Sequence, residues 1–480
     1  MTRAVLLAIL AAASAHAAVI RGIVVENFTG RVLTRALVIV QPLGGTPGDD
    51  ISVRTDRLGG FAFKVPAGVY LVKASRRGFM TVEHGQKRWN SAGQPLTVTE
   101  AEPAFLNLRL PRYGAVAGTV YDENEIGLPS IDVVVYRATQ PPEILTQVKT
   151  DELGHYRAGG LTPGKYVVRT AGGQYEDGSY QPTFSRETAR YEQAHVADVF
   201  LEQQTDHVDI RPLPGRTYGL PVSIDIDPPG TPVNITIASQ MGRRIVQASS
   251  YTFTGLSPGD YEVYCETLPG YPLQGAYQRV QVPGPSVNLI ADGPIGVRVY
   301  GDSSEKGELW ARRKDLAGAG ELNILSAAGA ALPFGRWDVM LRPPAGYHVA
   351  YANGGGGARR SRAEGWNEFL VTKRQLGPSF QIASGAGSIT GVVKDTPYAP
   401  VYLEGYDGTT RQRVGELWTA RADAQGRYRF ENLAPGMYRL VSTYEYLNPD
   451  TDTFDLANAA TVTLAAHGSG SKDLDLWVIR

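Results

Sequence analysis

The chain has 480 residues and a formal net charge of −1, so it has no overall basic field that would gather nucleic acid or an anionic membrane. It contains 55 glycines, 31 prolines and 25 tyrosines, with many short runs of alternating apolar and polar residues and no long helical periodicity. This pattern predicts an all-β chain. The length exceeds that of a typical domain of about 100–150 residues, so several domains in tandem are expected. A single cysteine, Cys265, excludes intrachain disulfides.

Residues 1–17 have the features of a secretory signal peptide. Arg3 precedes an apolar run, and Ala15-His16-Ala17 supplies an A-x-A cleavage site. Such a segment is removed from the mature protein. We therefore expect cleavage near Ala17, a mature chain that begins at Ala18, and a location in the periplasm or at the cell surface. No later run reaches the ~20 apolar residues of a membrane helix, so no membrane span is expected after the signal peptide is removed.

One sequence motif recurs along the chain at intervals of about the size of a domain. Its fullest copy, residues 423–440, has the form Asp-x-x-Gly-x-Tyr-x-Phe-x-x-Leu-x-Pro-Gly-x-Tyr-x-Leu. Residues 151–168 repeat it with the same spacing. Three further copies are less complete and lie at residues 56–72, 251–263 and 333–339.

We interpret each copy of the motif as a β-hairpin. Asp423 and Gly426 favour a tight turn, and the aromatic residues that follow, two positions apart, point to one face of a strand. Pro435-Gly436 fits a type II turn, after which Tyr438 begins the returning strand. Because the aromatic residues alternate as a buried face does, we assign them to the core and not to ligand contacts.

The motif copies and the strands around them divide the chain into domains. Each domain is expected to open on a strand such as Gly22-Ile-Val24 and to end on an alternating exit strand. In the third domain, Cys265 shares the inward parity of Tyr261 and Val263, which predicts a small buried hydrophobe. Short joints favour a semi-rigid rod. The expected domains after the signal peptide are 18–112, 113–213, 214–291, 292–385 and 386–480.

The copies resemble the carboxypeptidase regulatory-like domain. The resemblance is carried by an opening Gly391-Val-Val393, by Asp423-x-x-Gly426-x-Tyr428 and by Leu433-x-Pro435-Gly436-x-Tyr438, with equivalents that begin at Gly22 and Gly118. It implies a transthyretin-like, Greek-key β-sandwich of about seven strands, which is grouped with carbohydrate-binding-like sandwiches. Such domains occur in tandem in secreted bacterial proteins and as a non-catalytic module of metallocarboxypeptidases. The expected fold class is therefore all-β, a tandem array of about five such sandwiches.

No catalytic residue, cofactor site or metal site is predicted. A zinc carboxypeptidase needs a His-x-x-Glu pair and a distant histidine, but none of the seven histidines is followed by Glu at the third position, and His195 with Asp198 is the nearest approach. A nucleophile elbow, a P-loop and a dinucleotide fingerprint are also missing from the sequence. Asp450, Asp452 and Asp455 could supply oxygen ligands to calcium, although a solvated acidic loop is the alternative.

Two tryptophans are the candidate carbohydrate-binding residues. A sugar site needs an exposed aromatic ring beside hydrogen-bonding side chains. Trp89, within Lys87-Arg88-Trp89-Asn90, and Trp366, beside Asn367, have such neighbours. The alternative is that each ring folds back on its own domain.

The sequence favours a secreted, non-catalytic protein that acts as a structural or interaction rod of the adhesion type in the cell envelope. Its expected partner is a cell-envelope protein or a glycan. A carbohydrate-binding protein and an accessory subunit of an extracytoplasmic peptidase are the alternatives.

Overall fold

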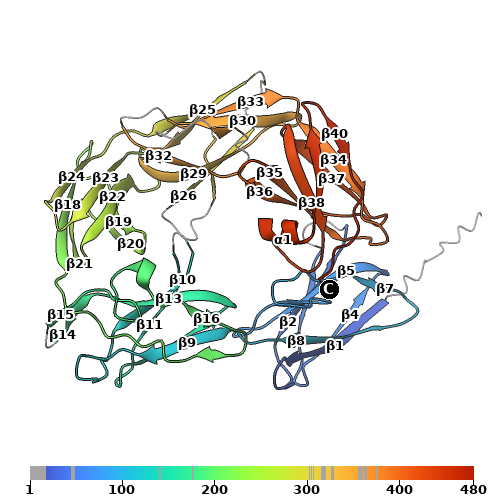
Figure 1. Cartoon of the computed structure of the whole chain (residues 1–480), viewed down its shortest axis with the longest axis horizontal. Helices are drawn as coiled ribbons and strands as arrows, with labels where there is room; N and C mark the ends of the chain where they lie inside the picture. The colour runs from blue at the N-terminus through green and yellow to red at the C-terminus, as the bar shows by residue number, and fades with distance from the viewer. Residues whose placement is uncertain are drawn as a thin grey trace, which may run out of the picture. The chain divides into compact units, whose positions relative to one another are not determined.

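The computed structural model describes residues 18–44, 49–139, 142–175, 178–301, 303, 305, 307–314, 321–325, 329–354, 360–361, 365–373 and 377–479. The predicted signal peptide, residues 1–17, lies outside the described residues. The chain forms two compact units, one of residues 1–113 with 444–447 and one of residues 114–443 with 448–480. Strands dominate both (Figure 1), as predicted. None of the described helices is long and apolar enough to cross a membrane.

The first unit contains a sandwich of two sheets. One sheet has the order β4-β1-β8 and the other β3-β2-β5-β6, with β7 also paired to β5. Buried side chains from both sheets, among them Ile20, Phe63 and Val72, form one core between them. The strands are β1 (Ala18–Glu26), β2 (Leu37–Pro42), β3 (Ile51–Arg54), β4 (Gly60–Val65), β5 (Gly68–Ser75), β6 (Val82–Glu83), β7 (Leu96–Val98) and β8 (Ala104–Leu110).

The second unit starts with two sheets of the same kind, β12-β9-β17 and β11-β10-β13-β16, and a small hairpin, β14-β15. Val116, Val135 and Tyr166 belong to the core of this sandwich. Its elements are β9 (Gly114–Thr119), β10 (Asp132–Arg137), β11 (Glu143–Lys149), β12 (His155–Leu161), β13 (Gly164–Thr170), β14 (Gly173–Tyr175), β15 (Gly178–Tyr180), the 3-10 helix η1 (Tyr191–Gln193), β16 (Ala197–Val199) and β17 (Gln204–Thr205).

Two further sandwiches follow in the second unit. The first of them is built from the sheets β21-β18-β24 and β20-β19-β22-β23. The next is built from the sheets β28-β25-β33-β30-β31 and β27-β26-β29-β32. The strands of the first are β18 (Tyr218–Asp225), β19 (Val233–Ser239), β20 (Gly242–Gln247), β21 (Ser250–Leu256), β22 (Gly259–Thr267), β23 (Gly275–Val282) and β24 (Val287–Ile290). Those of the next are β25 (Ile295–Tyr300), β26 (Glu308–Arg313), β27 (Leu322–Asn323), β28 (Ala330–Leu332), β29 (Gly335–Arg342), β30 (Tyr347–Asn353), β31 (Arg360–Ser361), β32 (Asn367–Val371) and β33 (Ser379–Ser384).

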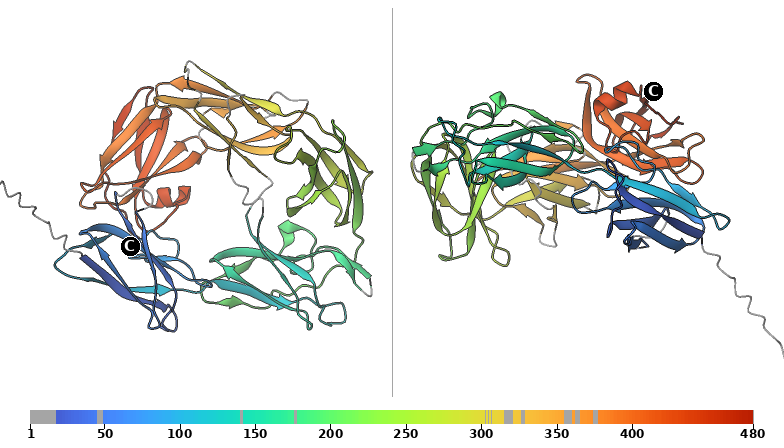
Figure 2. Two further views of the ribbon diagram at one scale, coloured as in Figure 1. Left: turned by 180° about the vertical axis from the view of Figure 1, so that it is seen from behind. Right: turned by 90° about the horizontal axis from the view of Figure 1, so that it is seen from below.

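The last sandwich is built from the sheets β37-β34-β40 and β36-β35-β38-β39. A short helix, α1 (Thr451–Leu456), contacts β38 (Figures 1 and 2), and its Phe454 packs against Tyr402 and Val441. The strands are β34 (Gly387–Val392), β35 (Pro400–Asp407), β36 (Gln412–Arg421), β37 (Arg427–Leu433), β38 (Gly436–Ser442), β39 (Ala460–Leu464) and β40 (Ser469–Ser471).

One sheet order recurs through the chain. In this order the opening strand of the sandwich lies in the middle of a three-stranded sheet. The first strand of the motif pairs with it on one side and is antiparallel, and the exit strand pairs with it on the other side and is parallel. The sheets with this order are β4-β1-β8, β12-β9-β17, β21-β18-β24 and β37-β34-β40. The predicted fold class, an all-β tandem array of sandwiches, is confirmed. The exact domain boundaries stay a prediction.

The motif is not a hairpin, so that prediction is wrong. Its two strands belong to different sheets, since β37 pairs with β34 and β38 pairs with β35. Gly436 has a φ of 149°, whereas a type II turn needs about 80° at this position. Each copy carries the chain from one sheet of a sandwich to the other. The same separation holds for β4 and β5, β12 and β13, β21 and β22, and β28 and β29.

A side-chain hydrogen bond fixes each crossing. The hydroxyl group of Tyr438 donates to the carbonyl oxygen of Ala434, four residues earlier, at 2.8 Å. A buried carbonyl that leaves its sheet needs a new donor, and the arrangement is that of a tyrosine corner. In the reduced copy, Trp337 Nε1 donates to the carbonyl oxygen of Pro333 at 2.9 Å. The other copies use Tyr70 with Pro66, Tyr166 with Thr162 and Tyr261 with Ser257.

The first aromatic residue of the motif packs over a glycine of the opening strand. Tyr428 is paired with Gly391, and its hydroxyl group donates to the Lys472 carbonyl at the exit strand. A Cβ atom on Gly391 would overlap that carbonyl oxygen. In the third sandwich the partner is Val222, and its Tyr251 is 44% exposed. The expectation that Tyr251 is a core residue is wrong, because the valine side chain takes the space that a glycine leaves to the ring. Equivalent pairs are Gly22 with Phe61 and Gly118 with Tyr156.

We predict that Gly391→Ala destabilises the last sandwich by about 1–3 kcal/mol, because the added methyl group pushes the opening strand away from the exit strand. Calorimetry of the full chain should show a lower unfolding temperature for this sandwich. The matched control is Gly408→Ala, since a Cβ atom there would meet Met437 at an ordinary 3.9 Å. Equal unfolding temperatures in the two variants would contradict the packing described.

Candidate functional site

Trp89 lies in the turn after β6 and is 38% exposed. The cations beside it already have a partner. Lys87 Nζ and Arg88 Nη2 pair with Glu445 at 2.8 Å and 3.0 Å, and the side chain of Glu445, which belongs to the same unit, is only 5% exposed. Trp89 is therefore an exposed ring whose cationic neighbours are held by a buried carboxylate. Sugar binding by Trp89 stays a prediction.

Trp366 lies directly before β32 and is half-buried. The guanidinium group of Arg312 sits over its ring, with Cζ 4.1 Å from the ring centroid, and Arg312 Nε also pairs with Asp338 at 3.3 Å. One face of the indole is thus covered by a cation of its own sandwich. Trp89 and Trp366 belong to different units, and sugar binding by Trp366 also stays a prediction.

The aspartates considered as a calcium site lie at the short helix α1. Asp450 is its N-cap, and its Oδ1 accepts a hydrogen bond from the Thr453 amide at 2.8 Å. Asp455 pairs with Arg439. The interpretation as an acidic loop is wrong, because the residues form a capped helix. Over the described ranges, no group of three or more His, Cys, Asp or Glu residues is placed to hold a metal ion.

A buried ion-pair network lies beneath this helix. The carboxylate of Glu404 on β35 is fully buried, and it pairs with Arg439 and, at 2.8 Å, with Arg413. Burial alone would lower the pKa of Arg439, but its hydrogen bonds to Asp455 and Glu404 raise it instead. Removing one partner would leave a buried charge uncompensated. The network therefore holds α1 to the sheet and has a structural role.

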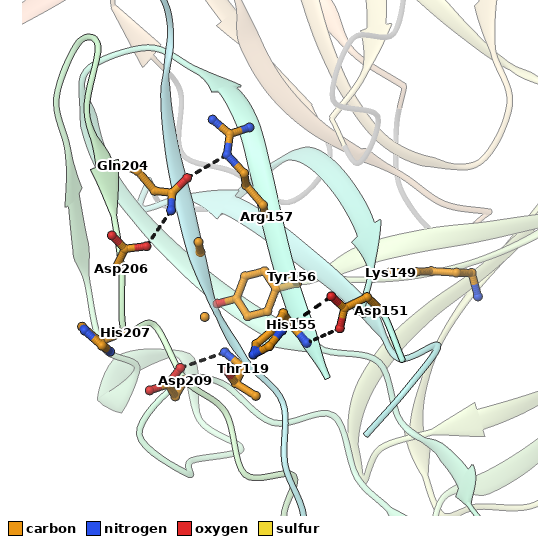
Figure 3. Close-up of a pocket in the computed structure, with 12 residues that line it drawn as sticks. Thr119, Lys149, Asp151, His155, Tyr156, Arg157, Gln204, Asp206, His207 and Asp209 are labelled. Carbon is orange, nitrogen blue, oxygen red and sulfur yellow. Dashed lines mark hydrogen bonds and ion pairs between the residues drawn. The ribbon is translucent and has the colours of Figure 1, made fainter. Parts of the chain in front are cut away.

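A polar depression of about 500 Å³ lies over the sheet β12-β9-β17 (Figure 3). Five of the twelve residues that line it have side chains bonded to one another. The side chain of Gln204 accepts from Arg157 Nε at 2.7 Å and donates to Asp206 at 2.6 Å, and His155 Nδ1 lies 3.5 Å from Asp151 Oδ2. The hydrogen-bonding groups of these five side chains are thus engaged within the protein.

A buried arginine joins two sandwiches of the second unit. The side chain of Arg313, at the end of β26, is 4% exposed and pairs with Glu266 of β22 at 2.5 Å. Its Nη1 also donates to the carbonyl oxygen of Phe334 at 2.9 Å. Its Cζ lies 4.4 Å from the ring centroid of Tyr264 and 4.3 Å from that of Trp337. The guanidinium group is thus enclosed by residues of both sandwiches.

A second ion pair reinforces this junction. Arg336 Nε of β29 lies 2.5 Å from Glu262 Oε1 of β22, and its Nη1 lies 3.1 Å from Glu368. Burial opposes the charge of Arg336, but the hydrogen bond with Glu262 raises its pKa. Tyr277 of β23 packs against the core of the following sandwich. Sequence reasoning did not find this junction, because its residues lie on strands that are far apart in the chain.

Cys265 is fully buried, as predicted. Burial raises the pKa of its thiol to about 11. The thiolate is the reactive form of cysteine, so Cys265 acts as a small core hydrophobe.

A family model of the carboxypeptidase regulatory-like domain matches residues 19–111, which include β2 to β8 and all of β1 except Ala18. The predicted resemblance is therefore confirmed, on the first copy of the motif. A search of curated proteins found no match to the chain.

Solved structures with a partial likeness include bacterial pilins. The minor pilin GBS52 of Streptococcus agalactiae is 15% identical, with a TM-score of 0.25, over 41% of this chain and 96% of its own. The shaft pilin SpaA of Lactobacillus rhamnosus GG is 10% identical, with a TM-score of 0.16, over 37% and 97%. The Bacillus anthracis TIE protein is 10% identical, with a TM-score of 0.17, over 92% and 68%. Similarity this low says nothing about function. Residues 19–111 match the model of the carboxypeptidase regulatory-like domain, and most of the later sandwiches repeat the three-stranded sheet order found there.

Proposed function

We propose that the chain is an extracytoplasmic, non-catalytic protein with a structural or interaction role of the adhesion type in the cell envelope. The observation that carries the proposal is the junction at Arg313. An enclosed guanidinium group that pairs with Glu266 ties two successive sandwiches together. A protein that holds or presents surfaces needs neighbouring domains that do not move independently, and such a junction supplies this.

The compartment follows from the sequence of residues 1–17, which has the features of a signal peptide. The partner in this proposal is a cell-envelope protein or a glycan.

Carbohydrate recognition is the second candidate, and the exposed indole of Trp89 favours it. Its site would use the ring together with groups other than Lys87 and Arg88, which are paired with Glu445. The third alternative, an accessory role beside a peptidase, has no described residue in its favour.

We predict that Glu266→Ala destabilises the junction by about 3–5 kcal/mol, because Arg313 would remain buried without its carboxylate. In calorimetry of the full chain, the two joined sandwiches should unfold at a lower temperature and as separate transitions.

The matched control is Asp260→Ala on the same strand, β22. Asp260 pairs with Arg279 at 3.5 Å, and both side chains are 63% exposed, so we expect a change of at most about 1 kcal/mol. If Glu266→Ala behaves like Asp260→Ala, the junction does not couple the sandwiches and the structural role loses its support.

The proposed compartment has its own test. When the full chain is expressed in a bacterium with an intact export pathway, we expect it outside the cytoplasm with Ala18 as its first residue. The measurement is N-terminal sequencing of the protein from each cell fraction. Recovery of the uncleaved chain from the cytoplasm alone would contradict the proposal.

A further inference from the structure

A cleft of about 780 Å³ lies within the second unit, between the sandwich of β9–β17 and the sandwich of β18–β24. Strands β10 and β13 contribute to one wall and β19 and β20 to the other, and these strands lie near one another in Figure 1. The two sandwiches touch at its edge, where the hydroxyl group of Tyr136 donates to the carbonyl oxygen of Met241 at 3.0 Å. Met241 also packs with Tyr136, Val167 and Phe184.

Four arginines line this cleft, and the described residues of its lining include no aspartate or glutamate. The arginines are Arg169 on β13, Arg216 before β18, and Arg243 and Arg244 on β20. The whole chain has a formal net charge of −1, so this local excess of positive charge is not a consequence of a basic composition. A concave site lined by charges of one sign concentrates ligands of the opposite sign.

Two polar atoms in this lining have unused hydrogen-bonding capacity. Arg169 Nε and Ser257 Oγ are buried and have no hydrogen-bond partner. Arg169 is held in place by Phe184, with its Cζ 5.3 Å from the ring centroid. A buried polar atom without a partner destabilises the protein unless a ligand or water satisfies it. Arg169 is therefore a preorganised donor.

The other residues of the cleft indicate the class of ligand. Arginine presents its donors in a planar fork that fits carboxylate, phosphate and sulfate groups. The volume lies within the range of about 300–1,000 Å³ typical of ligand pockets and is far larger than one inorganic anion. Ser239 and Thr217 add hydroxyl groups, whereas Ile144, which is 41% exposed, adds apolar surface. Charge, hydroxyl groups and apolar C–H faces occur together in an acidic sugar.

We propose that this cleft binds an acidic oligosaccharide, whose anionic groups pair with the arginines and whose ring faces pack on the apolar side chains. The site does not depend on the junction at Arg313 or on the proposed compartment. A failure to bind would leave the structural proposal intact, and uncoupling of the junction would leave the cleft in place.

The test is isothermal titration calorimetry of the full chain with trigalacturonate, with a sulfated tetrasaccharide derived from heparin, and with the neutral sugar maltotriose. We expect saturable binding of at least one acidic probe, weakened by added salt, and an affinity for maltotriose lower by about tenfold or more. Binding of one acidic probe alone would support the site and identify carboxylate or sulfate as the group recognised.

The variants Arg169→Gln and Arg243→Gln should each raise the Kd of the acidic probe by about tenfold or more. Arg169 packs on Phe184, so Arg169→Gln could also disturb the core. Arg243 is partly exposed, and Arg243→Gln therefore tests the cleft without changing the core. The control is Arg279→Gln, whose arginine is exposed on β23 and does not line the cleft.

Three results with the sugar probes would overturn the proposal. These are no saturable binding of either acidic probe, equal affinity for maltotriose, and equal Kd values in wild type, Arg243→Gln and Arg279→Gln. Tighter binding of a tri-aspartate peptide than of both acidic sugars would also overturn it, since the cleft would then recognise an acidic peptide.

Discussion

The carbonyl group at each sheet crossing is the constraint on which the sandwiches depend. Where the chain leaves one sheet for the other, this carbonyl lies outside the ladder of either sheet, and leaving a buried one such as that of Ala434 without a donor would cost about 1–3 kcal/mol. Tyr438 supplies the donor from four residues further along, and Trp337 does the same through its indole N–H. Because a phenol and an indole form equivalent bonds, the motif specifies a donor at this distance, and tyrosine is one way to provide it.

The surfaces around these cores contain two kinds of arginine. Arg313 is enclosed by two aromatic rings and paired with Glu266, so its charge stabilises the contact between two sandwiches. Arg169 and Arg243 line a cleft whose described lining has no carboxylate, so their charge is available to a ligand. The same residue type thus provides a rigid joint in one place and a recognition surface in another, and the difference lies in the position of the nearest acidic side chain.

The sequence predicted the features that depend on residues close together in the chain, such as which side chains of a strand are buried. Alternation placed Tyr428 and Tyr438 in the core, as observed, but a hairpin and a sheet crossing are both two alternating strands joined by Pro-Gly. Only the distant partners, β34 for one strand and β35 for the other, distinguish them. The cap of α1 was detectable, because Asp450 three residues before Thr453 is an N-cap signal. The arginine cleft was not, since only Arg243 and Arg244 are adjacent in the chain.

The most direct test of the role of the crossing is to measure amide hydrogen exchange in the full chain, for the wild type and for Tyr438→Phe. The control is Tyr271→Phe, since Tyr271 is 49% exposed. Loss of one buried hydrogen bond should speed amide exchange by about tenfold in both β37 and β38. Other sandwiches and the control should be unchanged. If faster exchange is confined to residues 434–436, or if Tyr438→Phe matches Tyr271→Phe, the crossing does not hold the two sheets together.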